Sequence, residues 1–212
     1  MTAATTILLA LGILASGPAG PSPALAQESL PIPDEYRPLS AEQWLDKGLS
    51  YLERKDFSRA VDAFSKAIGK KPSLVDAYIM RGITYGQHQD RQDLALADFT
   101  KALELDPRNS WAYDLRGATW VSKGELDRAL EDFNKALELN PGNAQIYYNR
   151  GQTWKAKGDL DQAIQDVRMA ISITSDRPEY HQALAELETL KAQQAPEEKK
   201  VQQACFIGAS GE

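Results

Sequence analysis

A glycine that recurs every 34 or 35 residues constrains this chain more than any other feature. The spacings between Gly48, Gly82, Gly117 and Gly151 are 34, 35 and 34 residues. One aromatic side chain precedes each glycine by four positions and another follows it by three: Trp44, Tyr78, Tyr113 and Tyr147, then Tyr51, Tyr85, Trp120 and Trp154. Positions −4 and +3 fall on one stripe of an α-helix. The pattern therefore predicts helical units stacked side by side.

The second half of each unit carries its own pattern. A small residue, a large apolar residue and a second alanine follow in order: Ala60, Phe64 and Ala67; Ala95, Phe99 and Ala102; Ala129, Phe133 and Ala136; Ala163, Val167 and Ala170. Alanines seven apart leave a groove for a neighbouring helix, and Pro72, Pro107 and Pro141 end three of the units. We expect helix pairs at 41–54 and 57–70, 75–88 and 92–105, 110–123 and 126–139, and 144–157 and 160–173.

The chain after the fourth unit is predicted to close the array. An amphipathic segment at 178–192 would cover the last unit with one apolar side and turn its polar side to water. Residues 194–212 show no helical period, so we expect a disordered tail.

These matched positions resemble the tetratricopeptide-repeat (TPR) family, over roughly residues 41 to 193. The resemblance implies an all-α, right-handed α-solenoid of four helix-turn-helix repeats plus a C-terminal capping helix. The repeats would be residues 41–74, 75–109, 110–143 and 144–177, with the capping helix at 178–192, all within one TPR domain at 41–193.

The resemblance also implies an inner groove that holds peptide ligands. It is lined by the residues three before, one after and four after each glycine, which read Leu45, Leu49, Leu52; Ile79, Ile83, Gly86; Asp114, Ala118, Val121; and Tyr148, Gln152, Lys155. With two neighbours of this face, the predicted groove residues are Leu45, Leu49, Leu52, Ile79, Met80, Ile83, Trp111, Val121 and Tyr148. Alternatively, the aliphatic residues complete the core, or the proline-rich lead-in occupies the groove. Some family members bind a C-terminal carboxylate with Lys and Asn where this chain has Leu45 and Leu49, which cannot donate hydrogen bonds.

A basic residue precedes each landmark glycine, and in three units an aspartate stands in the second helix. Comparing the units predicts the pairs Arg81 with Asp98, Arg116 with Asp132, and Arg150 with Asp166, whereas the first unit has Lys47 and Ala63. Such pairs would be structural, because an unpaired charge near a packed interface is costly. The alternative is an arginine ladder that binds an anionic ligand.

The N-terminus resembles an export signal. Residues 3–16 form an uncharged, largely apolar run, shorter than the about 20 residues that span a bilayer. Ala24, Leu25 and Ala26 before Gln27 predict cleavage after Ala26, which gives a signal peptide at 1–26 and a lead-in at 27–40. Because no Lys or Arg precedes the run, an uncleaved tether or a misassigned start is the alternative. We expect a periplasmic or secreted protein without a stable membrane span after cleavage.

Composition narrows the function further. The net charge is −6 with both signs interspersed, so no basic stripe exists for nucleic acid. One cysteine, Cys205, and two histidines, His88 and His181, offer no metal-ligand spacing and a poor catalytic inventory. We therefore expect no cofactor and no enzyme. The sequence favours an adaptor or scaffold of the bacterial cell envelope that binds an apolar or amphipathic segment of a partner protein. The alternative is a ligand-binding or accessory subunit of an envelope enzyme or polysaccharide system.

Overall fold

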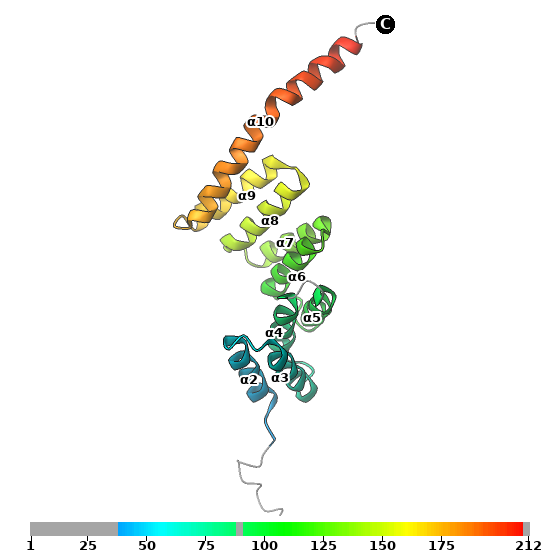
Figure 1. Ribbon diagram of the computed structural model, residues 1–212, viewed down its shortest axis with the longest axis vertical. Coiled ribbons are helices and arrows are strands. Elements are labelled where there is room, and N and C mark those ends of the chain that lie inside the picture. Colours follow the sequence, from blue (N-terminus) through cyan, green and yellow to red (C-terminus); the bar gives the residue numbers. More distant parts are fainter. Residues whose placement is uncertain (1–37, 88–90, 210–212) are drawn as a thin grey trace, which may run out of the picture. The chain divides into compact units, whose positions relative to one another are not determined.

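A computed structural model describes residues 38–87 and 91–209, with side chains as far as residue 194 (Figure 1). Every regular element within those ranges is a helix. They are α2 (Ala41–Glu53), α3 (Phe57–Lys70), α4 (Val75–Gly86), α5 (Gln92–Leu105), α6 (Ser110–Ser122), α7 (Leu126–Leu139), α8 (Ala144–Lys157), α9 (Leu160–Ile173) and α10 (Pro178–Ala209). The prediction of an all-α helical repeat is confirmed, and the first eight of these helices begin at the predicted residues. The predicted signal peptide, most of the lead-in and part of the inserted turn near His88 lie outside the described residues.

Side chains and turns set where the helices begin and end. Ser40 and Gln43 form a reciprocal capping box at α2, with Ser40 N–H to Gln43 Oε1 at 2.8 Å. Asn109 accepts from the Ala112 amide at 2.9 Å at the start of α6. Gly124 and Gly158 turn the chain at positive φ, 79° and 87°, where a side chain would be strained.

The packing of each pair explains the landmark glycines. Phe64, Phe99 and Phe133 are at most 2% exposed and lie against the glycine of the first helix. A Cβ atom on Gly82 would come within 2.7 Å of the Phe99 ring, and one on Gly117 within 2.9 Å of the Phe133 ring. The two helices of a repeat can approach this closely only because the glycine has no side chain.

The capping helix differs from the prediction. We expected it to end at 192 with a disordered tail, but α10 continues to Ala209. Residues 193–209 lack an apolar stripe, which is why the pattern gave no helix there. They are nevertheless rich in Gln, Ala, Glu and Lys, whose intrinsic helix propensity is high. Within the part with described side chains, Tyr180, Ala183 and Leu187 are buried toward α8 and α9.

Candidate functional site: the inner helix face

The three predicted Arg–Asp pairs form, and each is bidentate. The Nε of Arg81, Arg116 and Arg150 lies 2.8 Å from one carboxylate oxygen, and the terminal nitrogen Nη2 lies 2.7–2.8 Å from the other. The partners Asp98, Asp132 and Asp166 are 5–8% exposed in their side chains. We call these three pairs the arginine ladder. The hydrogen bond to the aspartate is the main cause that raises the pKa of Arg81 and Arg116 above the ordinary value.

Each arginine of the ladder also reaches back to the preceding repeat. The remaining nitrogen, Nη1, donates to Ser65 at 2.9 Å from Arg81, to Thr100 at 3.3 Å from Arg116, and to Asn134 at 2.6 Å from Arg150. Sequence reasoning missed this bond. Its signal was a polar residue directly after the second-helix aromatic in the first three units. Because each guanidinium nitrogen already donates within the protein and the aspartate compensates the charge, the contacts favour a structural role for the ladder over an anion-binding one.

A second set of ion pairs joins successive repeats at the surface. Lys123 contacts Asp93, Lys157 contacts Asp127, and Lys191 contacts Asp161. Lys191 belongs to α10, so this helix docks onto α9 as a first helix of a repeat docks onto the repeat before it. Exposed pairs of this kind contribute little stability individually, but they mark a regular register.

We use "inner face" for the positions three before, one after and four after each landmark glycine on α2, α4, α6 and α8, with Met80 and Trp111 beside them. Leu49 is 36% exposed and Trp111 is 46% exposed. The other predicted groove residues except one are partly buried: Leu45, Leu52, Met80, Ile83, Val121 and Tyr148. The inner face therefore presents apolar side chains that packing covers only in part.

Ile79 is the exception, and its assignment to the groove is wrong. It is 0% exposed and packs in a core cluster with Ala112 of the next repeat, against which Leu115 also lies. The side of α4 that carries Ile79 faces α6 rather than solvent. Tyr148 is similarly engaged, because its ring lies 4.8 Å from that of Tyr180 on α10.

Asp114 occupies in the third repeat the position that Ile79 occupies in the second. Its carboxylate accepts a hydrogen bond from the side-chain amide of Asn149 on α8, with Nδ2 and Oδ1 2.9 Å apart. Burial raises the pKa of Asp114, and the bond from Asn149 only partly offsets this. No cation pairs with Asp114 among the described residues. The sequence pattern placed Asp114 on this face, where the other repeats have Leu45, Ile79 and Tyr148, but the list of predicted groove residues left it out.

A cavity of about 200 Å³ opens on the same face between α4 and α6, and we call it the α4–α6 pocket. Ile83, Leu115 and Ala118 contribute apolar walls. A Cβ on Gly86 would meet nothing within 4 Å, so the space beside it is open. Gly86 and Ala118 are small residues at positions where the first repeat has Leu52 and Leu49, which leaves room for the pocket.

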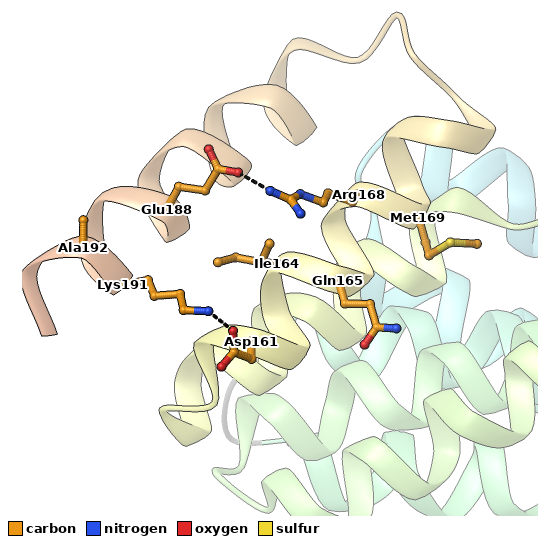
Figure 2. Close-up of a pocket in the computed structure, with 8 residues that line it drawn as sticks. All are labelled: Asp161, Ile164, Gln165, Arg168, Met169, Glu188, Lys191 and Ala192. Atoms are coloured by element: carbon orange, nitrogen blue, oxygen red, sulfur yellow. Dashed lines mark hydrogen bonds and ion pairs between the residues drawn. The ribbon is translucent and has the colours of Figure 1, made fainter. Parts of the chain in front are cut away.

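A larger cavity of about 640 Å³ lies between α9 and α10 (Figure 2). Ile164 and Met169 supply apolar surface, and Met169 is 41% exposed. Figure 2 shows two ion pairs that bridge the helices across this cavity, Arg168 with Glu188 and Lys191 with Asp161. These two pairs include all four charged residues that line the cavity.

The described residues offer neither a membrane-spanning helix nor a metal-ligand cluster. None of the described helices contains a stretch long and apolar enough to cross a bilayer. Within the same residues, no cluster of three or more His, Cys, Asp or Glu side chains is placed to hold a metal ion.

Comparison with known proteins follows the repeat pattern. Models of the tetratricopeptide repeat match residues 24–74, 45–110 and 144–177, and a TPR repeat model matches 117–158. The heat shock protein sti1 homolog of Schizosaccharomyces pombe is 34% identical over 87 residues, which cover 41% of this chain and 15% of that protein. The mitochondrial import receptor subunit TOM70 of Homo sapiens is 28% identical over 91 residues, 43% of this chain and 15% of its own length. The chain thus spans only about a sixth of these curated relatives.

Solved structures resemble the chain over a larger share of its length. The crystal structure of MamA superposes with a TM-score of 0.63 at 25% identity, and it covers 68% of this chain and 84% of its own. YrrB, described as a TPR protein with an unusual peptide-binding site, has a TM-score of 0.60 at 27% identity. The match covers 70% of this chain and 74% of YrrB. The repeat pattern, the glycine–phenylalanine packing and these matches together show that this chain belongs to the tetratricopeptide-repeat family.

Proposed function

We propose that the protein is an adaptor or scaffold that binds a segment of a partner protein on its inner face. The observation that carries this proposal is the exposure of Leu49 and Trp111 on a face that the repeat packing covers only in part. An aromatic side chain near the centre of a partly apolar strip is a common anchor of protein interfaces. YrrB, a structural relative, is described as having a peptide-binding site, which supports a peptide as the kind of ligand.

The preferred segment is apolar or amphipathic. Leu45, Leu49 and Leu52 make the first repeat of the inner face aliphatic, and the fourth has Gln152 and Lys155 at comparable positions. Lys155 is already paired with Glu186 at 2.7 Å, so it is not free to capture a terminal carboxylate. We place this binding in the bacterial cell envelope, because the N-terminal apolar run and Ala24–Ala26 resemble a cleaved export signal.

Crosslinking and capture from native envelopes test the proposal. The wild-type chain should recover a specific polypeptide, identified by mass spectrometry. Leu49→Glu should abolish capture, and Trp111→Ala should weaken it by about 30-fold or more. Both variants should keep nearly the wild-type Tm, because neither side chain belongs to a core cluster.

Glu131→Lys on α7 is the control and should leave capture intact. If Leu49→Glu unfolds the chain, the residue is core and the proposed surface is wrong. If the variant folds and still captures its partner, binding lies elsewhere. The same envelope preparation tests export, for which we expect an N-terminus at Gln27; intact Met1 on most copies would contradict it.

A further inference from the structure

The inner face carries an uncompensated negative charge. Asp46 and Asp76 lie on the same side of α2 and α4 as Leu49 and Ile83, at helical spacings of three and seven residues. Neither has an ion-pair partner among the described residues, nor has Asp114. The basic side chain of this face, Lys155, is held by Glu186. A ligand of this face therefore meets carboxylates that no internal cation neutralises.

Asp114 differs from the other acids because it is partly desolvated. It is fixed by the 2.9 Å bond from Asn149, and its second carboxylate oxygen has no hydrogen-bond partner among the residues with described side chains. That oxygen is not enclosed, because no buried polar side-chain atom in the described part of the chain lacks a partner. A carboxylate held in this way interacts more strongly with a cation than a fully solvated one does.

Trp111 lies one helical turn before Asp114 on the same side of α6. Trp111 is 46% exposed, although packing does not require an aromatic at this position, which is Glu42, Asp76 or Gln145 in the other repeats. An indole face attracts a cation, most strongly when the site is partly dry. An exposed tryptophan and an oriented carboxylate at this spacing therefore suit the same positively charged group.

The α4–α6 pocket lies one turn further along α6. Ala118, which lines it, is four residues after Asp114, so the two positions are about 6 Å apart along the helix axis. In an extended segment, residues i and i+2 point to the same side and are about 6.7 Å apart. One short segment can therefore place an apolar side chain in the pocket and a second side chain at Asp114.

The geometry points to a subsite for a lysine or arginine side chain at Asp114 and Trp111, filled by an extended partner segment whose apolar residue two positions away enters the α4–α6 pocket. This inference rests on the proposed function and specifies its ligand. The bound segment is basic and amphipathic, opposite in charge to a segment recognised through its terminal carboxylate.

A random nine-residue peptide library displayed on phage tests the inference with the full-length chain. Selection on wild-type protein should enrich peptides that carry Lys or Arg two positions from an apolar residue. Selection on Asp114→Asn, which keeps an acceptor for Asn149, should lose the basic preference and keep the apolar one.

One selected peptide is then synthesised, and its affinity for the wild-type chain and for variants tests the contact at Asp114 directly. Asp114→Asn should weaken binding by about tenfold, and replacing the basic residue of the peptide with Gln should do the same. The two changes together should cost little more than either alone, because they remove the same contact. Trp111→Leu should weaken binding about threefold. Glu131→Gln, which removes an equal charge from α7, should change binding less than twofold.

The outcomes separate the two proposals. Enriched peptides without the basic residue, or with acidic residues in its place, would overturn this inference while leaving inner-face peptide binding intact. The inference would also be overturned if Asp114→Asn and the Gln replacement in the peptide weakened binding additively. A library that yields no binder to the wild-type chain would overturn the inference and count against the proposed function as well.

Discussion

The arginine ladder and the inner face lie on the same first helices, but the ladder contacts are the same in three repeats whereas the inner-face residues differ between repeats. In the ladder, three repeats make the same three hydrogen bonds from the same guanidinium nitrogens. On the inner face, the position of Ile79 holds a buried aliphatic in one repeat and the polar Asp114 in the next. Repetition therefore marks the contacts that stack the helices, and variation between repeats marks the surface available for recognition.

Two neighbouring junctions show the difference within the inner face itself. Between α4 and α6, Ile79 is sealed in a cluster against which Leu115 packs. Between α6 and α8, the corresponding contact is the hydrogen bond from Asn149 to Asp114. At Ile79 the first junction is sealed and stabilises the array, and the α4–α6 pocket opens beside it, nearer the ends of the two helices. The second leaves a carboxylate partly desolvated, which costs stability and offers binding.

The largest effect should come from the packing shared by all repeats. Phe133→Ala removes a fully buried ring beside Gly117 and should lower the free energy of unfolding by about 3–5 kcal/mol. Leu49→Ala on the inner face is the comparison and should cost less than about 1 kcal/mol. Urea unfolding followed by circular dichroism measures both. Equal losses would erase the distinction between the stacking contacts and the inner face.

Breaking a pair of the arginine ladder should cause the next largest loss of stability. Arg116→Leu leaves Asp132 buried without its cation and should destabilise the chain by about 2–4 kcal/mol. Adding Asp132→Asn should recover part of that loss, and the cycle should show coupling of about 0.5–3 kcal/mol. Strictly additive losses would mean that the ladder does not stabilise the stack.

Asp114→Asn should change the stability least, and it should raise the stability rather than lower it. Because burial raises its pKa in the folded state, the folded chain binds a proton more readily than the unfolded chain, so deprotonation at neutral pH opposes folding. Asp114→Asn should therefore raise Tm slightly at pH 7. The difference should shrink as the pH falls through the raised pKa of the folded carboxyl and should vanish below the pKa of the unfolded one. Thermal melts at several pH values measure it, and a lower Tm for the variant at pH 7 would show that the carboxylate supports the fold.

The helix positions and ladder partners followed from the sequence because they repeat. Four aligned units fixed the starts of eight helices, and the absence of both Arg and Asp from the first unit indicated the pairs in the other three. Ile79 was misplaced because helical spacing says which side of a helix a residue occupies, not what lies opposite it. The continuation of α10 was missed because it rests on propensity without an apolar stripe. The role of Asp114 required knowing that Asn149 comes beside it.

The reach of each ladder arginine into the preceding repeat has a consequence for the order in which the array opens. A guanidinium bond joins each of repeats two to four to the repeat before it, and a bidentate Arg–Asp pair joins the two helices within each of these three repeats. The first repeat has Lys47 and Ala63 in place of the pair, and Lys47 lies instead over the Trp44 ring at 5.1 Å. In a linear array, opening starts at the terminal unit whose own helices are least well joined to each other. Amide protons of α2 should thus exchange with solvent before those of α6 and α7, and the chain should unravel from its first repeat onward.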